Sequence, residues 1–365
     1  MAFISGSLII DAPASALNNS GESISAARTE NTSAVKFIRA QDGGEYPYVS
    51  GQAVRYWHRD TLESSPDIEW HSSKVYRGDK VAYTDANPLL YWDDDLFGYM
   101  RAPASRDYKK TKQDEQTQGL TPLEEDEKGN PKAVTRAAPY RIGTLVSVGS
   151  VKMTQDFGTM TRQDGDPVPY EHLFYRAVLS TLFSVNLRTA GVFTYQRRSG
   201  FQNLDKVRRD LAAEMGLEHL EDEKSYRFPA AERARRVRSL MLGLGRLTGG
   251  AKQATHYTDV SPAVIVAAVV RGGNHPFNYL FSFNAGRDIR KIEFALDVFQ
   301  QAVADVEKHN LLLSPVYVGW KPGFLPEERA KLETLNGENI QLSTPLQATA
   351  DLAQFITDHP EVMDQ

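Results

Sequence analysis

The chain contains no cysteine and no long apolar run, and both absences narrow the classes of protein it can be. Without cysteine it has no disulfide framework, no thiolate nucleophile and no cysteine-ligated zinc or iron–sulfur cluster. The longest uninterrupted apolar run, residues 263–270, is far shorter than the ~18 residues that span a bilayer. No basic stretch followed by an apolar segment marks the first residues, so we expect a cytoplasmic protein that binds no membrane.

The charge of the chain is low overall and unevenly distributed. Its 365 residues include 42 Lys and Arg against 47 Asp and Glu, which gives a formal net charge of −5. Residues 114–127 contain six acids and no base, and residues 324–365 carry a net charge of −6, which leaves +7 on the remainder. Because the acids are segregated in this way, the net charge does not exclude a nucleic-acid partner.

Hydrophobic patterns predict four strands and two long helices in the order β-α-β-β-α-β. The strands are expected at 2–10, at 141–153, within 174–195 and at 263–270, and the helices at 50–62 and 231–247. This is the element order of a ferredoxin-like α+β fold. A further helix is predicted at 289–309 and a short strand at 316–318. The polar stretch 105–136 is predicted to be a mobile projection.

Templates for catalysis and metal binding are absent from the sequence. The eight histidines are scattered, and none forms HExxH or another close metal-ligand spacing. Residues 243–249 resemble a dinucleotide fingerprint, but a threonine replaces the third glycine and the segment ends a helix. Asp93, Asp94 and Asp95 could hold a magnesium ion, although an exposed turn is the favoured interpretation. We therefore expect no catalytic residue, no metal site and no cofactor.

The start of the first predicted helix suits contact with a phosphate backbone. Ser50 is a plausible N-cap, and with Gly51 it leaves free backbone N–H groups that attract anions. Arg55 and Arg59 are four residues apart, so they are neighbours on the helix surface. An ordinary solvated helix face explains the same arginine pair equally well.

A glycine-rich segment at the end of the second predicted helix has similar chemistry. Gly250 lets the backbone approach a phosphate, while Lys252 adds charge and Gln253 adds hydrogen bonds. A helix cap followed by a solvated loop is the alternative. The arginines at 233, 235, 236 and 238 cannot all share one helix face, so part of this cluster is expected to be ordinary solvated residues.

Three motifs in a fixed order resemble those of a known family. They are an N-terminal strand followed by ALNNSG at 16–21, then YVSGQAVRYWHR at 48–59, and GGAKQAT at 249–255. This combination resembles the DevR-like branch of the CRISPR-associated protein seven family, within the RAMP superfamily. Members of that family form the repeated backbone of type I Cascade surveillance complexes.

The resemblance implies a modified RNA-recognition-motif core, in agreement with the predicted element order. The core would comprise 1–64, 141–195 and 231–320. Residues 65–140 would form a fingers-like insertion with a mobile acidic loop, and residues 196–230 a thumb-like protrusion. Residues 321–365 would form an acidic C-terminal extension.

The resemblance also implies a function without catalysis. The chain would bind guide RNA (crRNA), polymerise head to tail along it, and present its spacer for pairing with target DNA. The implied partners are crRNA, the target DNA strand, further copies of the chain, the crRNA 5′-handle cap subunit, the large and small subunits, and the crRNA-processing endonuclease.

Residue by residue, the resemblance assigns RNA contact to the three motifs. The assigned residues are Asn18, Asn19, Ser50, Gly51, Gln52, Arg55, Arg59, Gly250, Lys252 and Gln253. Charge and position add Lys36, Arg39, Arg197 and Arg198. Such groups hold a nucleic-acid backbone without reading its sequence.

Two other functions stay open. Related type III backbone proteins cut target RNA with an aspartate in the loop after the first strand, and Asp11 and Asp42 are the candidates here. Neither lies within the Asn18-Asn19 motif. A nucleic-acid-binding regulator is the other alternative, although the sequence has no helix-turn-helix pattern.

Overall fold

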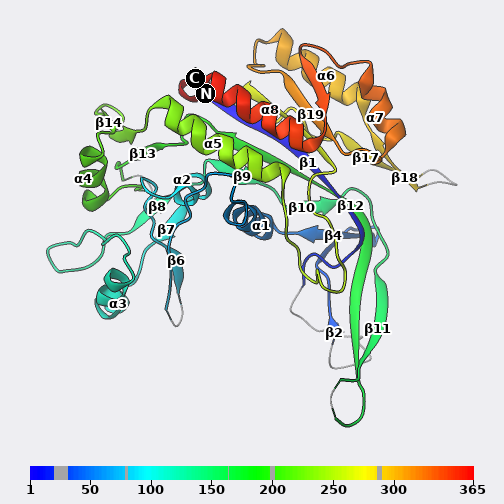
Figure 1. Cartoon of the computed structure of the whole chain (residues 1–365), viewed down its shortest axis with the longest axis horizontal. Coiled ribbons are helices and arrows are strands. Elements are labelled where there is room, and N and C mark those ends of the chain that lie inside the picture. The colour runs from blue at the N-terminus through cyan, green and yellow to red at the C-terminus, as the bar shows by residue number, and fades with distance from the viewer. Residues whose placement is uncertain (20–31, 79–80, 163, 198–201, 286–289) are drawn as a thin grey trace.

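The computed structural model describes the 365 residues except for 20–31, 79–80, 163, 198–201 and 286–289. It confirms the predicted α+β class, because an eleven-stranded, mostly antiparallel sheet is packed with helices in the described part of the chain (Figure 1). Within those described ranges, no helix is both long enough and apolar enough to cross a membrane.

Four strands at the centre of the sheet lie side by side, and each is antiparallel to the next. β1 (Ala2–Ser15) lies between β16 (Val264–Arg271) and β12 (Val168–Asn186), and β10 (Leu145–Ser147) pairs with the other edge of β12. The sheet also contains β2 (Thr32–Ser33), β3 (Phe37–Arg39), β4 (Glu45–Val49), β9 (Tyr140–Ile142), β11 (Thr154–Met160), β19 (Val316–Trp320) and β20 (Ile340–Ser343).

The helices next to this sheet include the two that the sequence predicts. α1 follows β1 and α5 follows β12, so β1, α1, β10, β12, α5 and β16 trace the predicted β-α-β-β-α-β order. The helices are α1 (Gly51–Glu63), α5 (Ala230–Gly245), α6 (Leu296–Lys308), α7 (Pro326–Glu333), α8 (Pro345–Asp358) and a 3₁₀ helix (Pro360–Asp364).

The alternation of side chains along β1 divides the core into two layers. Ile4 and Leu8 belong to the larger layer, together with residues of α1, α5 and α8. Ile9 points to the opposite face and joins the layer that contains Phe299 of α6 and Leu332 of α7. The sheet is therefore buried on both sides, which explains why β16 is apolar at nearly every position.

Two predicted strands have different bounds in the structure. The expected strand at 141–153 is divided into β9 and β10, because its register against β12 shifts by one residue between the pair Ile142 and Phe183 and the pair Val146 and Ser180, next to the Gly143 N–H that donates to the Leu182 carbonyl at 2.8 Å. The expected run at 174–195 starts earlier, at Val168, and pairs with β11, which the sequence did not predict. The β11 strand is exposed along most of its length, so it lacks the apolar alternation that marks a strand.

The helix predicted at 289–309 starts later than expected. Ile289 lies outside the described residues, and Arg290–Phe294 forms strand β18, which pairs with β17 (Phe281–Ala285). The helix α6 begins only at Leu296. Ile292 fits the helical spacing of Leu296 and Phe299, and it packs against the same core layer from a strand, which explains the wrong prediction.

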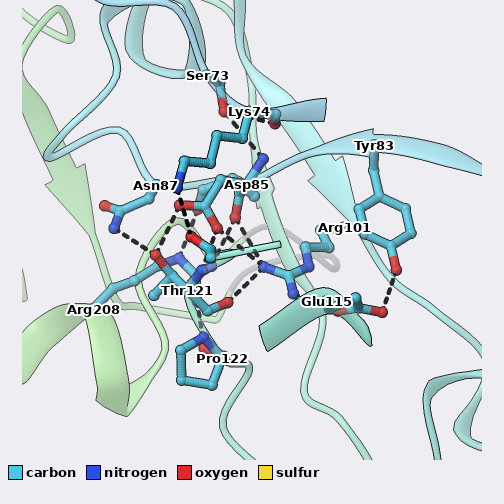
Figure 2. A network of polar contacts seen from close by, with 12 residues as sticks. Ser73, Lys74, Tyr83, Asp85, Asn87, Arg101, Glu115, Thr121, Pro122 and Arg208 are labelled. Carbon is cyan, nitrogen blue, oxygen red and sulfur yellow. Dashed lines mark hydrogen bonds and ion pairs between the residues drawn. The ribbon is translucent and has the colours of Figure 1, made fainter. Parts of the chain in front are cut away.

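The stretch predicted to be a mobile projection is folded. It lies within an insertion that contains β5 (Val75–Arg77), β6 (Ala82–Thr84), α2 (Trp92–Phe97), β7 (Tyr99–Arg101), α3 (Ser105–Thr117) and β8 (Val134–Arg136). Figure 2 shows the buried polar network that holds it together. Arg101 donates to Glu115 at 2.6 Å, and Asp85 accepts from the Thr121 hydroxyl at 2.8 Å. The amino-acid composition does not reveal which of these polar groups pair with each other.

The described part of residues 196–230, which were predicted to protrude, packs against that insertion. With β13 (Val192–Thr194) they form a three-stranded sheet through β14 (Glu218–Leu220) and β15 (Ser225–Arg227), next to α4 (Lys206–Glu214). Arg208 of α4 is fully buried and donates to the Asp85 and Ala86 carbonyls at 2.9 and 2.6 Å. The element that extends away from the body is instead the β11–β12 hairpin (Figure 1).

Residues 321–365, predicted as an extension, complete the core. β20 pairs with β19 in the central sheet, and α8 packs on α5 through side chains such as Leu352 and Ile356. Asp364 forms an ion pair with the buried Arg233 at 2.5 Å, and the Gln365 carbonyl accepts from the Ala2 N–H at 2.8 Å. The two ends of the chain consequently lie side by side (Figure 1).

Candidate nucleic-acid interface

Four segments that are distant in sequence meet beside the start of α1. The Leu17 carbonyl accepts from the Ala251 N–H at 3.0 Å, and the Asn18 carbonyl accepts from the Lys36 N–H at 3.2 Å. The Asn18 side-chain amide donates to the Tyr48 carbonyl at 3.1 Å. We call this assembly, residues 17–19, 36, 48–52 and 249–253, the cradle. All three motifs singled out from the sequence contribute to it.

The first turn of α1 forms one wall of the cradle. Ser50 is the N-cap, and its hydroxyl accepts from the Ala53 N–H at 3.4 Å. A Cβ atom at Gly51 would lie 2.8 Å from the Ile142 carbonyl oxygen, so only glycine fits there. Gln52 is exposed. The free N–H groups and the helix dipole at this end favour an anion.

The loop after α5 forms the opposite wall. Gly250 has a φ of +102°, and a Cβ atom there would lie 2.7 Å from Leu17, so glycine allows the loop to press against the first loop. Lys252 is exposed. The Gln253 amide donates to the Gly249 carbonyl and accepts from the Thr258 N–H, so this side chain shapes the loop from within.

Arg55 and Arg59 lie on another face of α1, toward α2. Arg55 donates to the Tyr140 carbonyl at 3.0 Å and to the Phe97 carbonyl, and Arg59 lies 4.5 Å above the Phe97 ring. Burial, with the adjacent Arg59 charge, lowers the pKa of Arg55. Among the described residues, no carboxylate forms an ion pair with either guanidinium. The pair therefore remains two adjacent positive charges, with Arg55 also joining α1 to the insertion.

The residues added for their charge have different surroundings. Lys36 is half-buried within the cradle, and Asn19 is exposed opposite Val35. Arg39 forms an ion pair with Glu45 at 3.0 Å at the edge of the sheet. Arg197 is exposed but follows β13 in the small sheet, which the structure does not bring to the cradle, and Arg198 lies outside the described residues.

An aromatic row next to the cradle was missed by the sequence analysis. Tyr170 stacks on His172 with ring centroids 5.7 Å apart, and His256 of the loop lies 4.8 Å from His172 and 5.0 Å from Phe174. Burial, His172 and Lys252 lower the pKa of His256, so its ring is neutral near pH 7. The sequence pattern that could have predicted this row is the alternation of aromatic residues at 170, 172 and 174.

The three aspartates weighed as a metal site or an exposed turn are buried. Asp93 accepts from the Ser73 N–H at 2.8 Å, and Asp95 forms ion pairs with Arg136 and Arg236 at 2.5 and 2.9 Å. Burial raises the pKa of both Asp93 and Asp94. The exposed-turn interpretation was wrong. In the part of the chain that the structure describes, no three His, Asp or Glu side chains gather as metal ligands.

The arginine cluster on α5 is only partly solvated. Arg233 is buried and donates to the Ala190 and Met363 carbonyls at 2.7 and 2.6 Å. Arg236 is buried against Asp95, whereas Arg235 is exposed and pairs with Glu69. Burial of an arginine requires carbonyl and carboxylate partners that are distant in sequence, so the pattern alone could not identify it.

By its fold, the chain is an α+β protein with a central antiparallel sheet and large inserted segments. It belongs to the family of CRISPR-associated proteins described as "CRISPR-associated negative auto-regulator DevR/Csa2", which it matches over residues 6–286. That span includes every segment of the cradle, and it confirms the family predicted from the three motifs.

Two solved structures resemble the chain at low sequence identity. A chain described as "CRISPR RNA-guided surveillance complex" is 12% identical with a TM-score of 0.48, over 97% of this chain and 99% of that one. Another, described as "CRISPR RNA-guided surveillance complex, pre-nicking", is 11% identical with a TM-score of 0.49, over 96% and 99%. No curated protein matches the chain.

Proposed function

We propose that this protein is a non-catalytic backbone subunit of a type I CRISPR Cascade complex. It binds crRNA, polymerises head to tail along it and presents the spacer for pairing with target DNA. The observation that carries this proposal is the cradle, in which three motifs from distant parts of the chain meet at a helix start. Family membership supports the CRISPR-associated role.

The cradle suits a phosphate backbone. The N–H groups at Gly51 and Gln52 and the side chains of Asn18, Asn19 and Lys252 offer donors and positive charge to an anion. Such contacts position a strand and leave its bases free to pair, the general logic of RNA-guided recognition. The adjacent cations Arg55 and Arg59 extend the positive field toward the insertion.

The inserted segments have proposed roles of their own. Residues 65–140 serve as the fingers. The β11–β12 hairpin is better suited than residues 196–230 to act as the thumb, because it extends from the body and its outer part exposes Phe157, Met160 and Val168. Proposed partners are further copies of the chain, the crRNA 5′-handle cap subunit, the large and small subunits, and the processing endonuclease.

The surroundings of the two candidate aspartates favour a role without RNA cleavage. Asp11 forms an ion pair with Arg176, and Asp42 accepts from the Gly44 N–H at 2.9 Å, so both are engaged locally. The assembled complex, incubated with labelled complementary RNA and magnesium, should leave that RNA intact. Regularly spaced cuts would establish the ribonuclease alternative instead.

The cradle is tested by removing its exposed cation. Lys252→Ala should weaken crRNA retention and reduce the salt dependence of RNA binding by about one counterion, because one phosphate contact is lost. The matched control is Lys308→Ala, which removes an exposed lysine from the end of α6. RNA affinity is measured by fluorescence anisotropy at several salt concentrations. An unchanged salt slope for Lys252→Ala would refute the assignment.

A further inference from the structure

The unit formed by β13, β14, β15 and α4 carries an acidic face. Residues 210–223 contain six acids and no lysine or arginine, and all six acidic side chains are exposed. We call them the acidic face: Asp210, Glu214, Glu218, Glu221, Asp222 and Glu223. A surface with this charge repels an RNA backbone, so it does not fit the RNA-gripping role first expected for 196–230.

Among the described residues, four of the six acids have no lysine or arginine partner, and Glu221 lies 4.0 Å from a ring nitrogen of His219. Glu218 pairs with Arg227 at 2.8 Å and Glu223 with Arg188 at 3.3 Å. Asp210 and Glu214 are four residues apart on the exposed side of α4, where like charges repel and destabilise a helix. Next to them Met215 is 43% exposed, an apolar residue of the kind enriched where proteins dock.

A complementary cationic face lies on α3. Arg106, Lys109 and Lys110 are all exposed and share one side of the helix, since they are spaced by three and four residues. We call these three residues the cationic face. Residues 105–112 include four bases and one acid, Asp107. These like charges are neighbours on the helix surface, and their repulsion lowers the stability of α3.

Three of the six acids at 114–127 form ion pairs away from the cationic face, whereas the pKa of Asp126 is lowered by hydrogen bonds from Asn130 and also by the nearby charge of Lys109. Glu115 pairs with buried Arg101, Glu124 with Lys132, and Glu125 with Lys112 at 2.5 Å. Asp126 accepts from the Asn130 N–H at 2.8 Å within its own turn. The net charge of −6 on residues 114–127 therefore does not reveal that α3 has a positively charged face.

The two faces occupy the same end of the molecule without meeting. Figure 1 shows α4 above α3 at that end, and among the described residues no ion pair joins the acidic and cationic faces. We propose that the acidic face of one copy docks on the cationic face of the next copy. This rests on the proposed head-to-tail assembly and gives it a defined contact. A pair of copies that buries one acidic and one cationic face leaves one face of each kind free, so this heterologous contact can repeat along a filament.

Charge reversal tests the contact on the full-length protein. The variant Asp210→Lys/Glu214→Lys and the variant Lys109→Glu/Lys110→Glu should each lose the multi-copy species on a long single-stranded RNA, as counted by mass photometry. Each should need roughly tenfold more protein to coat that RNA, since like charges then face each other. The control Asp305→Lys/Glu338→Lys reverses two exposed acids near α6 and β20 and should coat the RNA normally.

The combined variant gives the sharper result. A chain with both reversals restores opposite charges across the contact, so it should regain the multi-copy species. Failure to regain it, or normal coating by both single-face variants, would overturn the proposal. Normal coating by the α3 variant together with weaker binding of a DNA duplex would assign the cationic face to nucleic acid instead. The affinity for a short RNA that holds only one copy measures the cradle alone. The experiments can therefore contradict one of the two proposals without contradicting the other.

Discussion

A single buried histidine makes the stability of this protein depend on pH. His58 of α1 is fully buried, and its Nε2–H donates to the Leu240 carbonyl at 3.0 Å while Nδ1 accepts from the Tyr140 hydroxyl at 3.1 Å. Burial, together with the nearby Arg59 and Arg55 charges, lowers the pKa of His58 from 6.5 to about 3. The folded protein therefore holds this ring neutral.

The sign of the effect follows from proton binding. Between pH 6.5 and about 3 the unfolded chain binds a proton at His58 that the folded chain does not, so the free energy of unfolding falls as the pH falls. From pH 6.5 to 5 this contribution amounts to about 1.6 kcal/mol. Urea unfolding at both pH values should show a smaller loss for His58→Gln, which retains a donor for Leu240. Equal losses would contradict the neutral ring.

Residue types alone predict the residues of the cradle better than they predict the buried ion pairs. Ser50 and Gly51 could be assigned because capping and glycine preference are local rules. Arg236 and Asp95 are 141 positions apart in the chain, and only the fold brings them together. The sequence predicted that Gln253 contacts RNA, but its side-chain amide forms hydrogen bonds within its own loop. The side-chain rotamer decides between these two roles, and the sequence does not specify it.

At the scale of elements, regular helices and buried strands were the predictable part. α1, α5 and β16 were placed within one or two residues, because their apolar spacing is continuous. The β11 strand and α3 were missed since they are mostly exposed and polar. Their stability comes from pairing with β12 and from buried ion pairs, neither of which leaves a local pattern.

The insertion at 65–140 and residues 203–228 should unfold as one unit. Arg101 and Glu115 are about 1–2% exposed and pair at 2.6 Å, so Arg101→Ala leaves a buried carboxylate without its cation. We expect a loss of about 3–5 kcal/mol in unfolding free energy. Hydrogen exchange should accelerate together in the insertion and in α4, because Asp85 and Arg208 join the two.

The control for this prediction lies on the adjacent helix. Arg106→Ala removes an exposed arginine from α3 and should change stability by less than about 0.5 kcal/mol. Faster exchange confined to the insertion, with α4 still protected, would show that the two segments unfold separately.

At the scale of the whole molecule, the C-terminal residues decide whether the core closes. α8 covers α5 and β19, so residues 321–365 cannot be treated as an appendage. Residues 324–365 carry a net charge of −6, and most of their acidic side chains lie on the outer surface of this layer, whereas Glu328 and apolar residues such as Leu352 are buried. The acidic residues that are concentrated at the end of the sequence therefore belong to a layer of the core and not to a separate extension.

A matched pair of leucines on α8 tests this role. Leu352 is 1% exposed and Leu346 is 56% exposed on the same helix. Leu352→Ala should cost about 2–5 kcal/mol because it leaves a cavity in the main core layer, whereas Leu346→Ala should cost less than about 0.5 kcal/mol. Both values come from urea unfolding. Similar small losses for the two variants would show that α8 is dispensable.

The position of β1 also determines when the protein can fold. Ile4 lies opposite Val185 on one side and Val269 on the other, so during synthesis β1 must wait for partner segments that are made much later. Pairings over such long separations form slowly, and an apolar strand with two open edges associates with other chains while it waits. We therefore expect the amount of usable protein in a cell to depend on the speed of synthesis and on chaperone protection of this strand, in addition to the stability of the finished fold.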